Sequence, residues 1–277
     1  MKIRLLLWIV AFFITILTAY YQRATGPTYP LKGSIKFSGK IINYKLDRSY
    51  GGSGDQIVVI KIPDQKIKGS LYYKRYKTND AYTEIKMQYT NGELKAGLPH
   101  QPPAGKLEYY IKLYNKQNVV HLPENRSVVT RFKGYIPLYV LIPHILAMFT
   151  AMLLSVRTGL EIFNKSSNLK KLTYWTIAIL FIGGLILGPI VQKYAFGALW
   201  TGVPFGWDLT DNKTLIAFLG WLIALFMYGK SKRPKLWATA ASILLIVVYL
   251  IPHSVMGSEL DYNKLDKQSK QPIENIK

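Results

Sequence analysis

Long apolar runs alternate with polar stretches along this chain. Five runs of roughly 16 to 22 residues lie at 5–21, 135–156, 172–192, 214–229 and 236–252. A helix rises about 1.5 Å per residue, so each run approaches the thickness of a bilayer core of about 30 Å. The pattern predicts about five transmembrane helices, the last two at the short end of the range.

Between the first and second runs, continuous hydrophobicity gives way to alternation. The segments 57–62, 70–76, 82–89, 107–113 and 127–132 are typical of strands. Asn91-Gly92 is a type I′ hairpin signal. About seven short strands in about 110 residues predict an antiparallel β-sandwich of immunoglobulin-like type.

These patterns divide the chain into four parts. Residues 1–23 are predicted to form an uncleaved signal anchor, because the run ends in large residues rather than in a cleavage site. Residues 24–134 form the β domain, and 135–256 form a four-helix transmembrane domain with an outer loop at 194–214. The tail, 257–277, is polar and without periodicity, and we expect it to be disordered.

Basic residues set the expected orientation. They gather in two short connections between the later runs: Arg157, Lys165, Lys170 and Lys171 in one, and Lys230, Lys232, Arg233 and Lys235 in the other. Such loops face the cytoplasm. We therefore expect a multi-pass protein of a bacterial inner membrane with a cytoplasmic N-terminus, and with the β domain, outer loop and tail outside.

Composition limits the chemistry and suggests partners. The absence of Cys excludes disulfides, thiolate metal sites and covalent haem attachment within the chain. No HExxH, GxSxG or phosphate-loop motif is present, and therefore no residue is named as catalytic. Whether the chain catalyses a reaction stays open.

The net charge is +21, and the β domain carries 20 Lys and Arg against 8 Asp and Glu between Arg23 and Lys133. This surplus suits anionic lipid or polysaccharide, or other membrane or envelope proteins, unless it is merely a solvated Lys-rich surface. The membrane anchors argue against nucleic acid.

The outer loop at 194–214 concentrates residues that suit a site. It contains Trp200, Trp207, Asp208, Asp211 and Lys213 among several glycines. Two blander interpretations stay open: the aromatic residues form an interfacial belt, and Asp208 or Thr210 caps the following helix.

A repeated tetrapeptide brackets this loop. Leu-Ile-Pro-His occurs at 141–144 and 250–253, so that His144 and His253 each follow a proline kink on the expected outer side. Either His alone suits a bond to a neighbouring helix, whereas the pair suits a shared site. His100 and His121, in the β domain, are interpreted as structural or surface residues.

The loop also resembles the Trp-rich (WWD-type) haem-handling membrane proteins of cytochrome c maturation. The resemblance rests on Gly197–Trp200, Gly206-Trp207-Asp208, Lys213-Thr214-Leu215-Ile216 and Trp221-Leu222. It implies that Trp200, Trp207 and Asp208 cradle haem and that His144 and His253 are axial ligands.

Two alternatives to this haem site remain. Lys193 or Lys213 suits haem propionates, while the set His144, His253, Asp208 and Asp211 suits a divalent metal instead of haem. The other interpretation is a structural or interaction protein without a cofactor, whose basic β domain binds a partner protein or an anionic envelope polymer while the helices serve as anchor.

Overall fold

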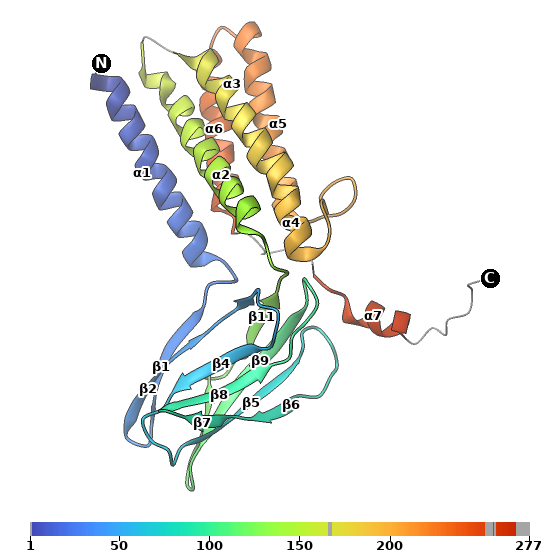
Figure 1. Cartoon of the computed structure of the whole chain (residues 1–277). Coiled ribbons are helices and arrows are strands. Elements are labelled where there is room, and N and C mark those ends of the chain that lie inside the picture. Colours follow the sequence, from blue (N-terminus) through green and yellow to red (C-terminus); the bar gives the residue numbers. More distant parts are fainter. Residues whose placement is uncertain (1, 166–167, 253–256, 258, 270–277) are drawn as a thin grey trace, which may run out of the picture. The chain divides into compact units, whose positions relative to one another are not determined.

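The computed structural model describes residues 2–165, 168–252, 257 and 259–269. The chain forms two compact units (Figure 1). The helical unit consists of Met1–Pro27 and Ile136–Ser258, and the β unit of Thr28–Tyr135 and Glu259–Lys277. The borders at 27 and 135 lie close to the predicted borders, but the tail belongs to the β unit rather than standing alone.

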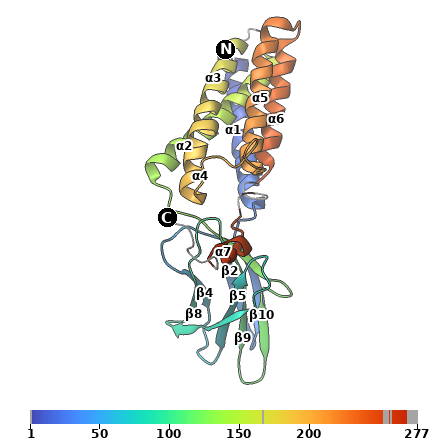
Figure 2. The same ribbon diagram turned by 90° about the vertical axis from the view of Figure 1, so that its right-hand side faces the viewer.

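The helical unit is a bundle of apolar helices (Figures 1 and 2). Its elements are α1 (Lys2–Thr25), α2 (Leu138–Gly159), a 3₁₀ turn η1 (Leu160–Phe163), α3 (Leu169–Leu180), a π segment η2 (Phe181–Leu187), α4 (Gly188–Phe196), α5 (Leu209–Lys230) and α6 (Pro234–Leu250). Four stretches among the described residues are long and apolar enough to cross a membrane: Lys2–Thr25, Leu138–Phe163, Leu169–Phe196 and Leu209–Lys230. The helix α6 is also apolar but shorter, with 17 residues.

Small residues let these helices approach one another. Ala151, Ala217, Ala224 and Ala241 are buried between helices, around the fully buried Trp221. A Cβ on Gly159 of α2 would collide with Ser242 of α6, and the Thr239 hydroxyl donates to the Gly159 carbonyl at 2.8 Å. Close packing through small residues is how helices associate in lipid, where water supplies no hydrophobic drive between them.

The β unit contains eleven strands in its described part, in three sheets. They are β1 (Leu31–Phe37), β2 (Lys40–Leu46), β3 (Ser49–Tyr50), β4 (Gln56–Lys61), β5 (Lys68–Arg75), β6 (Thr83–Lys86), β7 (Gln88–Thr90), β8 (Glu93–Leu98), β9 (Lys106–Tyr114), β10 (Val119–Leu122) and β11 (Val128–Phe132). The sheet orders are β1-β2, β4-β8-β7 and β3-β11-β9-β5-β6, with β10 also on β9. All pairs are antiparallel except β3 with β11.

Alternation along the strands builds one core. The nine residues of β9 are buried at every second position, and Leu107, Tyr109, Ile111 and Leu113 are fully buried. Inward side chains from all three sheets join the same hydrophobic cluster. The predicted strands are therefore confirmed in outline, and the hairpin at Asn91-Gly92 is confirmed by φ values of 50° and 80° and by the pair Thr90–Glu93.

Residues 259–269 of the tail differ from the predicted disorder, while 258 and 270–277 lie outside the described residues. Helix α7 (Tyr262–Ser269) packs on the β unit, where the buried Tyr262 hydroxyl accepts a hydrogen bond from the Lys106 amide at 3.0 Å. The Arg75 guanidinium binds Asp80 and, through two nitrogens at 2.8 Å, Asp266 of α7. Glu259 pairs with Lys106 at 2.9 Å. The sequence lacks a sign of this because the tail docks through single polar anchors rather than through an apolar stripe.

We expect Tyr262→Ala to release the tail, because it removes the one buried ring of α7 and leaves the Lys106 amide without its partner. The measurement is hydrogen exchange of residues 259–269, which should accelerate at least tenfold. Burial raises the pKa of Tyr262 to about 12, so this anchor stays protonated and docking persists until the pH rises above about 10. Asn263→Ala, on the exposed side of α7, is the control. Equal exchange in both variants would contradict this account.

Candidate functional site

The predicted outer loop is shorter in the structure than in the sequence analysis. Helix α4 ends at Phe196, and Gly197 follows with a left-handed φ of 87°. Helix α5 already begins at Leu209. The loop is therefore 197–208, while Asp211 and Lys213 belong to the first turns of α5.

Asp211 fastens this loop to the helices. One of its carboxylate oxygens accepts from the Thr201 amide at 2.7 Å, the Gly202 amide at 3.1 Å and the Gln192 side chain at 3.0 Å. Asp211 is buried, and a Cβ on Gly202 would lie 2.7 Å from the Asp211 Cβ and from the Asn212 Oδ1, so glycine permits this close approach. Asp211 thus holds the backbone of the loop through one carboxylate oxygen.

Asp208 and Asn212 complete the same construction. Asp208 is the N-cap of α5, and its carboxylate accepts from the Thr210 amide at 2.8 Å. The Asn212 side chain accepts from the Val203 amide at 2.7 Å. The capping interpretation of Asp208 is therefore confirmed.

The two tryptophans of the loop differ in their contacts. The Trp200 indole donates to the Val203 carbonyl at 3.1 Å, which fixes it as part of the loop. Trp207 is 87% exposed and Phe205 is 82% exposed. Exposed aromatic side chains at the end of apolar helices are typical of an interfacial belt.

The remaining predicted residues that the structure describes have partners of their own. The buried Lys213 ammonium donates to the Ile251 carbonyl at the end of α6. In α2, His144 places Nδ1 3.0 Å from the Gly183 carbonyl of η2. His253 lies outside the described residues, and the described ones contain no group of three or more His, Asp or Glu able to hold a metal.

A buried ion pair in the helical unit escaped the sequence analysis. Arg157, which was expected in a cytoplasmic loop, lies inside α2 and binds Glu161 at 2.6 Å, and both are almost fully buried. Asn164 donates to both Glu161 oxygens, and Lys235 donates to the Asn164 carbonyl at 2.6 Å. The i, i+4 spacing of Arg157 and Glu161 beyond an apolar run was the available signal. These contacts join α2, η1 and α6.

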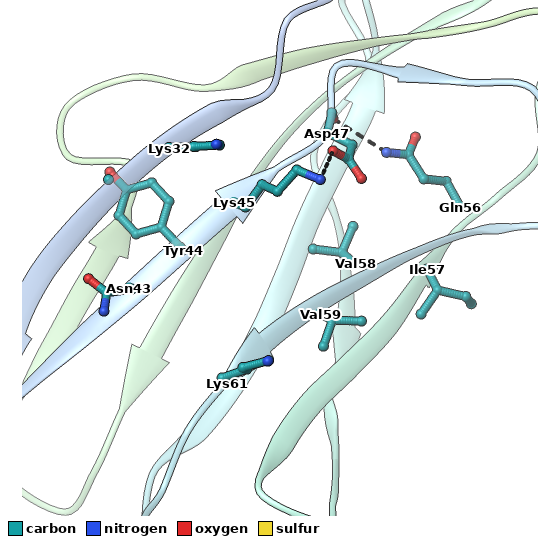
Figure 3. Close-up of a pocket in the computed structure, with 11 residues that line it drawn as sticks. Lys32, Asn43, Tyr44, Lys45, Asp47, Gln56, Ile57, Val58, Val59 and Lys61 are labelled. Atoms are coloured by element: carbon teal, nitrogen blue, oxygen red, sulfur yellow. Dashed lines mark hydrogen bonds and ion pairs between the residues drawn. The ribbon is translucent and has the colours of Figure 1, made fainter.

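The β unit has an open groove that the sequence analysis did not find (Figure 3). It measures about 520 Å³ and lies between β2 and β4. Lys32, Lys45 and Lys61 line it together with Asn43, Tyr44 and Gln56. Its single acid, Asp47, already lies 3.6 Å from the Lys45 ammonium. The groove therefore has a cationic surplus, and an anionic group can bind it.

The groove has a firm frame. Gly33 of β1 pairs with Tyr44 of β2, and a Cβ on Gly33 would collide with the Tyr44 ring. The ring therefore lies directly over Gly33. At the closed end, the Gln56 side chain is buried, accepts from the Thr130 hydroxyl at 2.8 Å and donates to the Asp47 carbonyl at 3.4 Å. The groove is thus preformed by two ordered strands rather than by a loop.

We expect Asp211→Ala to destabilise the helical unit, because two loop amides and the Gln192 side chain lose their acceptor. Each buried unsatisfied group costs about 1–3 kcal/mol. The thermal midpoint of the protein in detergent should fall by several degrees. Trp207→Ala, on the same loop but exposed, should leave the midpoint unchanged, and the reverse order of effects would contradict this role of Asp211.

Sequence comparison with known protein families and with characterised proteins finds no match to this chain. The resemblance to Trp-rich haem-handling proteins therefore stays a prediction carried by the residues of the loop alone. Function has to be argued from geometry, and two features of the described residues that can meet a ligand are the lysine groove of the β unit and the ring of His144.

Proposed function

We propose that this chain is a membrane-anchored binding protein whose basic β domain holds an anionic partner. The observation that supports this proposal most directly is the lysine groove, where three ammonium groups face one acid that is already paired. At the outer loop, by contrast, Asp211 accepts from a loop amide, Asp208 caps α5, and Lys213 donates to the Ile251 carbonyl after α6. On this proposal the helices serve as anchor.

The orientation belongs to the same proposal. Residues 259–266 contact the β domain, so the tail and the domain share one side of the membrane. Between them the chain passes through α2, the α3–α4 stretch, α5 and α6. An even number of crossings is needed, which favours a crossing by α6 despite its 17 residues, or about 26 Å of helix.

We infer a bacterial inner-membrane protein with five spans. Lys230, Lys232, Arg233 and Lys235 between α5 and α6 favour a cytoplasmic position for that connection. The β domain is then extracytoplasmic. Its immunoglobulin-like character remains part of this proposal, supported by the short antiparallel strands around one core.

Charge reversal in the groove tests the binding function. The pair Lys45→Glu and Lys61→Glu should weaken binding of the full protein to poly-L-glutamate at least tenfold at low salt, since each basic residue near an anionic surface contributes about 1 kcal/mol. The measurement is a binding titration in detergent at two salt concentrations.

The matched control changes the same charge elsewhere. Lys36→Glu with Lys86→Glu lies at exposed strand positions outside the groove. Equal weakening by both pairs would mean that only net charge matters, and the groove would lose its role.

A haem-handling role is the second candidate, supported by one observation at His144. A carbonyl only accepts, so the contact with Gly183 assigns the proton to Nδ1 and leaves a lone pair on Nε2. That is the tautomer a haem iron needs. The described carboxylates and Lys213 do not fit this role, since each already has a partner in the loop or in α6.

We expect haem-supplied protein, if this second role holds, to show a Soret band that shifts in His144→Ala. The surface residue His121 in the β domain gives the control, His121→Ala, which should leave the spectrum unchanged. Protein that stays colourless after haem supply would exclude the role.

A further inference from the structure

The lysine groove lies between two strands whose facing edges are unpaired. Among the described strands, β2 pairs only with β1, and β4 pairs only with β8. The two strands nevertheless run beside each other, and the groove is lined by both (Figure 3). An unpaired edge presents a row of backbone N–H and C=O groups that can accept another strand.

The register of β4 shows which groups face the groove. The Ile62 amide donates to the Gly92 carbonyl at 2.8 Å, at the start of the β4–β8 ladder. Hydrogen-bonding direction alternates along an antiparallel strand, so Ile60 and Val58 also face β8. The backbone groups of Ile57, Val59 and Lys61 therefore point to the opposite edge, and these residues line the groove.

Side chains around this edge define what can bind. Val58 and Ile60 point into the core, while Ile57 is 57% exposed and Val59 is partly exposed. Lys32, Lys45 and Lys61 supply cations along the same groove. Residues 57–61 span about 17 Å of extended chain at about 3.4 Å per residue. A short strand in which apolar and acidic residues alternate matches this arrangement.

We propose that the groove binds an extended acidic segment of a partner protein as an added β-strand. Main-chain hydrogen bonds to Ile57, Val59 and Lys61 supply affinity, and the lysines select acidic side chains. A second copy of this chain fits poorly, because β1, β2 and β4 carry five lysines and no acid and would repel one another. This inference rests on the proposed function of the groove and names its partner class.

Peptides test strand addition without altering the protein. The probe is a labelled octapeptide of alternating Val and Glu, titrated against the full protein in detergent by fluorescence anisotropy. Two N-methylated versions block alternate backbone amides and keep every charge and side chain. We expect the unmodified peptide to bind, and at least one N-methylated version to bind more than tenfold weaker.

The outcomes separate the two proposals. If both N-methylated peptides bind as tightly as the parent while Lys45→Glu with Lys61→Glu still weakens binding, the groove recognises charge alone and strand addition is wrong. If neither the octapeptide nor poly-L-glutamate binds, both proposals fail. Self-association of the protein that the octapeptide does not displace would assign the edges to a second copy and would also overturn the inference.

Discussion

A backbone amide or carbonyl that leaves water must find a hydrogen-bond partner, and this requirement shapes both units of the chain. In the apolar stretches the helices satisfy it internally. In the loop 197–208, where no helix or strand is available, the side chains of Asp211, Asp208 and Asn212 serve as acceptors. At the facing edges of β2 and β4 a row of backbone groups stays open beside a groove.

This requirement explains why the most distinctive stretch of sequence is structural. A turn rich in Gly between two apolar helices has many amides and few partners. Carboxylates placed just after it accept those amides and also cap α5, close to the positive end of its dipole. The acids of the loop therefore stabilise its fold, and Trp207 remains exposed beside them. Similar residue types would also suit a ligand site, so only contacts distinguish the two.

Periodic features of the chain were predictable, and singular contacts were not. Continuous hydrophobicity identified the helices, and period-two alternation identified β4, β5, β9 and β11, because many residues contribute to each signal. The first hairpin, β1–β2, was missed because Gly33 takes an inward position and the apolar Ile41 an exposed one, which weakens the alternation. The docking of α7 and the pair Arg157–Glu161 depend on single long side chains, whose partners lie far away or within one buried turn. For the candidate site, the sequence showed which residue types could bind a ligand. It did not show that their side chains form hydrogen bonds within the loop and the adjoining helices.

The lysine groove could not be predicted from the sequence either. Lys32, Lys45 and Lys61 are spread over three strands, and nothing in their spacing along the chain indicates that they converge. Their convergence follows from the order of the sheets, which leaves β2 and β4 adjacent but unpaired. A surplus of positive charge and an unpaired strand edge thus lie in the same groove, and the proposed function depends on this combination.

Hydrogen–deuterium exchange of the full protein, with and without poly-L-glutamate, tests this claim most directly. The account predicts slower exchange at amides of 43–45 and 57–61, with the loop 197–208 unchanged. Protection confined to the loop, or protection nowhere in β2 and β4, would contradict it.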